Sequence, residues 1–294
     1  MTPSDTRPDE TGLARLLDRR VTSRRRNRAI RLLGDPALTF RRKLLPGHIE
    51  RFETFWGQPM IGLSNETVAA TIMTSGYFEE GLTRTMLALL RPGMTVVDVG
   101  AHIGYFTLLA AHLVGNAGRI LSFEPTPATR ALLLDNVANQ PNVIVRSCAA
   151  WNSATTLRIR DFGRRFSAFN SFTAPRAAIG RHREIEVEAV PVDAELERHQ
   201  LRPDFIKIDV ESAERQVLEG LVLTLERLRP VVTLEVGDEG VPGVWSSVEL
   251  IDFMGSRFGY KAFEWHGGAL SPLRARDHWS YDNLIFAPRE RSFT

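Results

Sequence analysis

The segment TVVDVGAHIGYF, residues 95–106, restricts the possible folds of this chain more than any other feature. An apolar, β-branched run surrounds Asp98, a turn with Gly100 and Gly104 follows, and an apolar run typical of a helix begins behind it. Glycines let the backbone approach a ligand closely, and the amino end of a helix carries free N–H groups. In open parallel sheets, ligands bind outside the carboxyl ends of the strands. The segment therefore predicts a strand–turn–helix unit with a ligand site at the turn.

The same alternation of short apolar runs and helical patterns continues along the chain. It predicts a Rossmann-like α/β fold, with a mostly parallel seven-stranded sheet covered by helices on both faces. The last two strands are joined without an evident helix, so one antiparallel strand is expected at or near a sheet edge. The predicted strands are 95–99, 119–123, 143–149, 205–210, 231–236, 261–265 and 283–287.

Two domains of unequal size are expected. Residues 1–70 are predicted to form a basic, partly helical extension, and residues 71–294 form the main domain. Residues 1–43 hold 12 Arg or Lys against 5 Asp or Glu, which favours a solvated or partly disordered arm over a site for an acidic partner.

An insertion of about residues 152–200 interrupts the main domain. It contains two polar-alternating segments, Thr156–Arg160 and Glu184–Val190, which predict strands. The loop between them, Phe162–Phe172, offers Ser167, Asn170 and Ser171 as hydrogen-bonding groups. Long insertions in compact folds are often functional, so this loop is either a substrate lid or a packed surface hairpin.

Composition excludes several classes of protein. The chain has 294 residues, 43% of them hydrophobic and 24% charged, and a net charge of +2 that is too small to predict nucleic-acid binding. No signal peptide or run of about 20 apolar residues is evident, so a cytoplasmic protein without a membrane span is expected. Cys148 is the single cysteine and no metal-ligand spacing occurs, so a reducing compartment and no metal site are expected. Whether the chain forms a homo-oligomer is left open by the sequence.

Two carboxylates indicate the ligand. Glu124 follows the second strand. A carboxylate there can accept hydrogen bonds from both hydroxyls of an adenosine ribose, and it repels a 2′-phosphate. Asp98 would repel a pyrophosphate but suits a cationic ligand such as S-adenosylmethionine (SAM). The alternative for Asp98 is hydrogen bonding within the turn. Cys148 and Ala149 end the third strand and either leave space for an adenine ring or simply pack in the core.

A second polar strand end follows in DFIKIDVESAE. Lys207, Asp209 and Glu211 alternate with apolar residues, and charges in a buried strand are costly unless they are paired. Asp209, Glu211 or Lys207 could remove a proton from a hydroxyl as a general base. The alternative is that these charges pair with each other and, with Ser212, cap the next helix.

Together these motifs resemble the FkbM-type SAM-dependent methyltransferases. The resemblance covers residues 75–240 through FEEGL, RPGMTVVDVGAHIGYFTLLA, FEPTP, CAAWN, FIKIDVESAE and RPVVTLEV. It implies a class I methyltransferase fold, transfer to an oxygen of a secondary metabolite or glycan hydroxyl, and no metal for cofactor binding. The resemblance implies that Asp98, Gly100, Gly104 and Glu124 bind the cofactor. The other expected cofactor contacts are Phe123 and Pro125, which flank Glu124, and Glu79, Cys148, Ala149 and Asp209. Asp209 and Glu211 would lie in the catalytic cleft.

Two positions depart from common patterns. His102 stands where many methyltransferases have glycine. Its side chain either contacts the cofactor or the substrate, where it could also take part in catalysis, or it braces the loop. Ser212 stands where the family usually has glycine, which leaves the acceptor preference open. The competing functions are a NAD-dependent oxidoreductase on the same fold and a non-catalytic SAM-binding protein.

Overall fold

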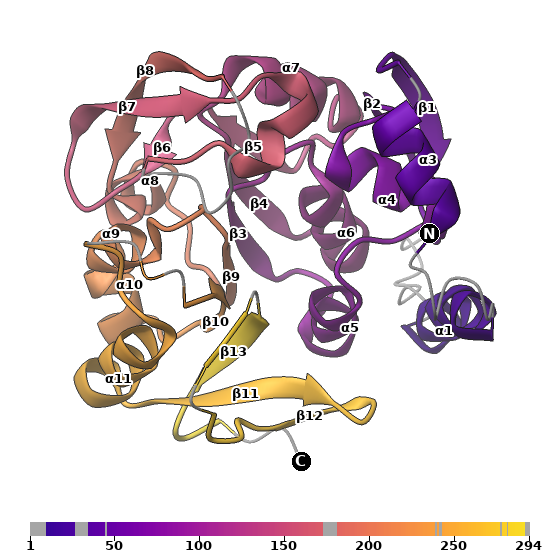
Figure 1. Cartoon of the computed structure of the whole chain (residues 1–294). Helices are drawn as coiled ribbons and strands as arrows, with labels where there is room; N and C mark the ends of the chain where they lie inside the picture. The colour runs from indigo at the N-terminus through magenta and orange to yellow at the C-terminus, as the bar shows by residue number, and fades with distance from the viewer. Residues whose placement is uncertain are drawn as a thin grey trace, which may run out of the picture.

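A mixed eight-stranded sheet forms the centre of the computed structural model, which describes residues 10–26, 35–44, 46–172, 181–238, 240, 243–276, 278–280 and 282–291. The strand order is β12-β11-β13-β10-β9-β3-β4-β5, and the last five of these strands are parallel (Figure 1). The strands are β3 (Thr95–Val99), β4 (Arg119–Phe123), β5 (Val143–Arg146), β9 (Phe205–Ile208), β10 (Val231–Val236), β11 (Tyr260–His266), β12 (Ala269–Pro272) and β13 (Asp282–Pro288).

The predicted α/β class is confirmed, and the structure adds one strand to the seven predicted. β12 pairs antiparallel with β11 across a turn at Gly267 and Gly268, both of which have positive φ angles. The antiparallel strand β13 does not lie at the edge, because β11 and β12 pair beyond it.

Helices cover both faces of the sheet because its strands are apolar on both sides. Val96, Ile120 and Phe205 pack in one core, and their strand neighbours Val97 and Leu121 pack in the other. Such two-sided burial is what a parallel sheet requires. The first core includes residues of α5 (Glu80–Leu89), α6 (Tyr105–Val114) and α7 (Pro127–Asn136), and the second includes residues of α8 (Val192–Arg198), α9 (Glu214–Glu219), α10 (Val222–Arg227) and α11 (Ser247–Phe258).

The described N-terminal part packs onto the main domain. Leu17 and Val21, on α1 (Glu10–Arg26), are buried in the first core, so this helix is not a solvated arm as the sequence favoured. A hairpin follows and is held by Asn136, whose side chain accepts a hydrogen bond from the N–H of Ile61 and donates to its carbonyl oxygen. The remaining elements are α3 (Pro36–Leu44), β1 (Ile49–Glu53), β2 (Pro59–Leu63) and α4 (Thr67–Ser75).

The insertion forms a separate three-stranded sheet of order β6-β8-β7. Its two predicted strands are present as β7 (Thr155–Asp161) and β8 (Arg183–Val190), and the 3₁₀ helix η1 (Arg164–Phe169) follows β7. The predicted strand 143–149 is divided, because the chain leaves the main sheet after Arg146 and continues as β6 (Ala149–Ala150) beside β8. None of the helices in the described ranges is long and apolar enough to cross a membrane.

Candidate functional site

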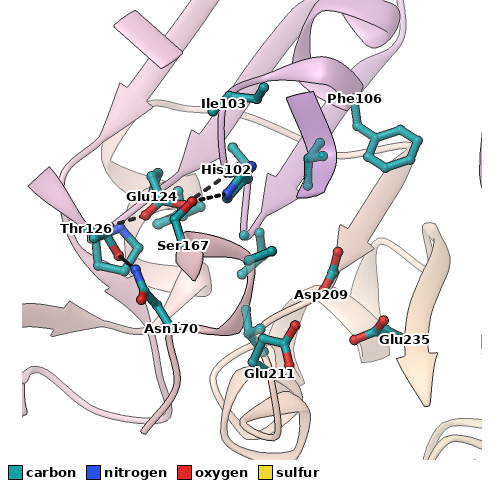
Figure 2. Close-up of a pocket in the computed structure, with 18 of the residues that line it drawn as sticks. His102, Ile103, Phe106, Glu124, Thr126, Ser167, Asn170, Asp209, Glu211 and Glu235 are labelled. Carbon is teal, nitrogen blue, oxygen red and sulfur yellow. Dashed lines mark hydrogen bonds between the residues drawn. The ribbon is translucent and has the colours of Figure 1, made fainter. Parts of the chain in front are cut away.

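A cavity of about 300 Å³ lies at the carboxyl ends of four adjacent parallel strands, β4, β3, β9 and β10. This is where open α/β sheets bind ligands. The segment after β7, which carries Ser167 and Asn170, closes the cavity from the side of the insertion (Figure 2), and the residues Phe78 and Glu79 before α5 border it from the N-terminal side. Its lining includes Phe78, Glu79, Gly100, Ala101, His102, Phe106, Phe123, Glu124, Pro125, Thr126, Ala149, Ala150, Ile159, Ser167, Asn170, Phe172, Lys207, Asp209, Glu211 and Glu235.

Most of the predicted site residues meet at this cavity. Phe123 and Glu124 end β4, while Ala149 lies in β6 and contributes an apolar wall. Three predicted residues lie outside the lining. Gly104 shapes the turn before α6, Cys148 is fully buried in the second core, and Asp98 lies beneath the cavity with 1% of its surface exposed.

Gly100 permits the close approach of two strand ends. Its φ is +80°, and a Cβ at this position would lie 1.8 Å from the backbone oxygen of Asp209. The N–H groups of Gly100 and Ala101 donate to the carbonyl oxygen of Phe123 at 3.1 and 2.9 Å. These two donors are therefore used within the protein, and at Gly100 and Ala101 the turn offers a fixed shape and not free N–H groups.

Glu124 is the buried carboxylate of the turn. Its Oε2 accepts a hydrogen bond from the N–H of His102 at 3.1 Å, and its Oε1 accepts one from the N–H of Thr126 at 2.8 Å. Burial raises the pKa of Glu124, although His102 and the N–H groups act in the opposite direction. A carboxylate has about four lone-pair sites, so each oxygen keeps acceptor capacity for a hydroxyl in the cavity.

Lys207 is the buried cation beneath the cavity. Its Nζ lies 3.3 Å from Asp98 Oδ1 and 3.4 Å from Asp209 Oδ2, and it donates to the carbonyl oxygen of Gly100 at 2.9 Å. Burial alone would lower the pKa of Lys207, but Asp98, Asp209 and Glu79 raise it above its ordinary value. Lys207 therefore holds its charge, which removes it from the candidates for a general base.

Asp98 has a structural partner on each side. Its Oδ2 accepts a hydrogen bond from the Thr107 hydroxyl at 2.6 Å, and Lys207 faces its other oxygen. Strand register explains the second contact, because Asp98 and Lys207 are direct neighbours in the pairing of β3 with β9. The Asp98 carboxylate thus holds Lys207 and α6 in place. This role differs from the two roles considered from the sequence, which were a contact with the cofactor and hydrogen bonding within the turn.

Two more carboxylates lie beside Asp209. Glu79 accepts a hydrogen bond from Asn283 Nδ2 at 3.2 Å, and burial together with Asp209 raises the pKa of Glu79 to about 8. Glu235, near the end of β10, is buried, and burial followed by Asp209 and Glu211 raises its pKa well above the ordinary range. The sequence analysis missed Glu235, although a charge inside the apolar run VVTLEV is the same signal that identified Lys207.

The start of the insertion covers the turn. Ser167 Oγ lies 2.9 Å from Nε2 of His102, and Asn170 Nδ2 donates to Thr126 Oγ1 at 3.4 Å (Figure 2). His102 has a φ of 51°, and its Nδ1 is buried without a hydrogen-bond partner in the described part of the chain. His102 therefore braces the loop through Ser167 and retains one free ring nitrogen. A separate pocket near β11, lined in part by Trp265, shares Glu79 with the main cavity.

The loop after β9 explains one departure from the family pattern. Ser212 has a φ of 78°, a left-handed conformation that glycine adopts most easily. The N-cap of α9 is Ala213, so Ser212 does not hold the capping position considered from the sequence. Glu214 instead accepts from the N–H groups of Val210 and Ser212 and holds this loop.

Known proteins similar to this chain are methyltransferases. The family model described as "Methyltransferase FkbM domain" matches residues 98–262, and a model of protein-L-isoaspartate(D-aspartate) O-methyltransferase matches residues 39–147. The chain is 33% identical over 177 residues to the 31-O-demethyl-FK506 methyltransferase FkbM of Streptomyces tacrolimicus, an alignment that covers 51% of this chain and 67% of that protein.

Two solved structures also show similarity. The methyltransferase FkbM from Methylobacillus flagellatus KT gives a TM-score of 0.45 at 17% identity over 68% of this chain, which spans only 45% of that longer chain. Fibrillarin of Aeropyrum pernix, in complex with bound S-adenosyl-L-methionine, gives a TM-score of 0.40 at 15% identity over 70% of this chain and 73% of that one.

The FkbM model spans more than half of the 294 residues, and this assignment replaces the alternative of a NAD-dependent oxidoreductase. The chain therefore belongs to the FkbM family of methyltransferases, and its cofactor is S-adenosylmethionine.

Proposed function

We propose that this methyltransferase acts on a hydroxyl oxygen of a secondary metabolite or a sugar. The observation that carries the proposal is the row of carboxylates along one wall of the cavity, formed by Glu79, Asp209 and Glu211. A hydroxyl must lose its proton when it is methylated, and a carboxylate within hydrogen-bonding reach is a suitable acceptor. The name of the Streptomyces tacrolimicus relative, a 31-O-demethyl-FK506 methyltransferase, agrees with this chemistry.

The cavity fits SAM on three counts. Glu124 has acceptor capacity for the two ribose hydroxyls beyond its bonds to His102 and Thr126. Phe123, Pro125 and Ala149 provide apolar surface for the adenine. The carboxylates suit the positive sulfonium and ammonium groups. We assign cofactor binding to these residues and to Gly100, with the free ring nitrogen of His102 facing the methionine part or the acceptor.

SAM supplies a methyl group that its sulfonium makes electrophilic. Lys207 holds Asp209 in place, and the N–H-bonded Glu124 keeps the turn in shape. Glu79, whose side chain is held by Asn283, accepts the acceptor's proton, and Asp209 orients the hydroxyl. SAM bound beside Glu79 and Asp209 would supply its methyl group to that oxygen and would leave as S-adenosylhomocysteine. Such positioning can supply much of the acceleration.

Product analysis with labelled SAM tests the reaction. The purified protein is incubated with methyl-labelled SAM and hydroxylated small molecules and sugars, and the product is identified by mass spectrometry and NMR. We expect an O-methyl ether. A product methylated on nitrogen would overturn the oxygen assignment, and SAM binding without any turnover across the panel would favour the non-catalytic alternative.

Glu79→Gln and Asp209→Asn test the roles of the two side chains. At saturating SAM, turnover of both variants should fall by about 100-fold or more, since general-base catalysis contributes about 10²- to 10⁴-fold, and SAM affinity, measured separately, should fall far less than turnover. The matched control is Glu80→Gln, one residue away, where the carboxylate pairs with Arg25 and Arg84 outside the cavity. Full activity of Glu79→Gln would reject Glu79 as the base.

A further inference from the structure

Three carboxylates from two neighbouring strand ends converge on one point of the cavity wall. Asp209 and Glu211 follow β9, and Glu235 is part of β10. One oxygen from each side chain can be chosen so that all three lie within 4.8 Å of one another. Figure 2 shows the three side chains turned toward a shared space at the lower end of the cavity.

Glu235 provides a second observation, independent of the carboxylate cluster, that this space binds a ligand. Only 8% of the residue is exposed, and its Oε2 has no hydrogen-bond partner among the residues that the structure describes. A buried polar atom without a partner costs about 1–3 kcal/mol, and more when the group is charged. Because Glu235 lines the cavity next to two other carboxylates, the missing partner would have to be positive or a donor.

The charges around this point leave room for another cation. Lys207 on β9 is the buried positive group here, and it already lies between Asp98 and Asp209. Glu79 at the start of α5 and Glu214 at the start of α9 add negative charge near Glu235. Asp209 faces Lys207 with Oδ2, and a carboxylate has acceptor capacity for more than one such contact.

We propose that Asp209, Glu211 and Glu235 form a site for a hard divalent cation, with Mg²⁺, Mn²⁺ and Ca²⁺ as the chemical class. These ions prefer carboxylate oxygens. Two oxygens that bind one Ca²⁺ at about 2.3–2.6 Å can be up to about 5 Å apart, so three oxygens within 4.8 Å of one another need at most a small movement to share this ion. Mg²⁺ binds at about 2.0–2.1 Å and requires that the three oxygens move slightly closer.

The cation has a role only if the proposed hydroxyl methylation is correct. Three protein ligands leave coordination positions that face the cavity, and an acceptor hydroxyl can occupy one of them. A hydroxyl bound to a divalent cation loses its proton more readily. The cation is unchanged by the reaction, while Glu79 receives the proton. This role would also fix the acceptor's orientation, and it favours acceptors with two neighbouring oxygens.

Manganese binding tests the site without any substrate. The purified chain, treated with a chelator and then freed of it, is titrated with Mn²⁺ and followed by electron paramagnetic resonance, which reports free Mn²⁺. We expect one site, with Mg²⁺ or Ca²⁺ as competitors. Glu235→Gln and Glu211→Gln should each weaken binding at least about 10-fold. The control Glu188→Gln, an exposed residue of β8, should bind like the parent.

Each outcome decides the question. No Mn²⁺ binding at millimolar free metal, or equal binding by the parent and both site variants, would overturn the cation site. Thermal unfolding of each variant confirms that it is folded, and Glu235→Gln removes the carboxyl group while it hardly changes the size of the side chain. If methylation of a hydroxyl proceeds fully in a chelator, the cation role fails and the proposed function stands. If Mn²⁺ binds at the three carboxylates but the labelled product is not an O-methyl ether, the proposed function fails and the cation site stands.

Discussion

Glu124→Gln is the perturbation that most directly tests how the cavity holds its cofactor. The carboxylate is buried and fixed by the N–H groups of His102 and Thr126, so its remaining lone pairs have a defined direction. A hydrogen bond to a charged group is worth about 1.5–3 kcal/mol. The amide keeps one acceptor oxygen and loses the charge, so we expect a loss of about 2–3 kcal/mol. That loss corresponds to roughly 30- to 150-fold weaker SAM binding.

Isothermal titration calorimetry with two ligands separates ribose recognition from damage to the turn. The amide nitrogen of the variant would face one of the two N–H groups that now donate hydrogen bonds to Glu124, so some local destabilisation is expected. Binding of SAM and of its 2′,3′-dideoxy analogue is therefore measured for the parent and the variant, below their unfolding temperatures. If Glu124 binds the ribose hydroxyls, the substitution weakens binding of the dideoxy analogue far less than binding of SAM. Equal losses for both ligands, or SAM affinity within about threefold of the parent, would refute the ribose assignment.

Two other predictions use the same region. Burial raises the pKa of Glu124, against the effect of His102, so the carboxylate is ionised at high pH and becomes protonated as the pH falls through that raised pKa. SAM affinity should accordingly fall as the pH is lowered through that raised pKa, and Glu124→Gln should lose this part of the dependence; an unchanged profile in the variant would assign it to another group. Ser212→Gly should stabilise the fold by about 0.5–1 kcal/mol, because relief of a left-handed conformation gains about 1–2 kcal/mol and the added freedom of the unfolded chain offsets about half of it. A lower urea midpoint would contradict this reasoning.

The strands around the cavity could be predicted because local sequence determines them. β3, β4, β9 and β10 are short apolar runs bounded by glycine, proline or charged residues, and all four are present where the sequence predicts them. The break between β5 and β6 could not be predicted, since Val143–Ala149 has one continuous pattern. The second half leaves the main sheet because it pairs with β8, a strand about 40 residues away in sequence. Pairing between distant segments leaves no local sign.

The same limit explains the buried N-terminal helix. Arg24 and Arg25 made residues 1–43 look like a solvated arm, yet Arg24 pairs with Asp35 and Arg25 pairs with Glu80. Leu13, Leu17 and Val21 share one face of α1 and pack in the first core, whereas Arg15 and Arg19 are exposed on its other side. A basic stretch can therefore be one face of a packed amphipathic helix, and only tertiary contacts distinguish it from an arm.

Asp98 shows how tertiary contacts change the role that the sequence suggests for a carboxylate. The sequence argument took its negative charge as a match for a cationic cofactor, but strand register places Lys207 beside it and neutralises that charge. The preference for a cationic ligand does not disappear with this pairing. Glu79, Asp209 and Glu235 line the cavity itself, and these three carboxyl groups above the single Lys207 oppose an anionic ligand and favour a cationic one. The electrostatic selection against a pyrophosphate thus comes from the wall of the cavity, while Asp98 holds in place the lysine that anchors that wall.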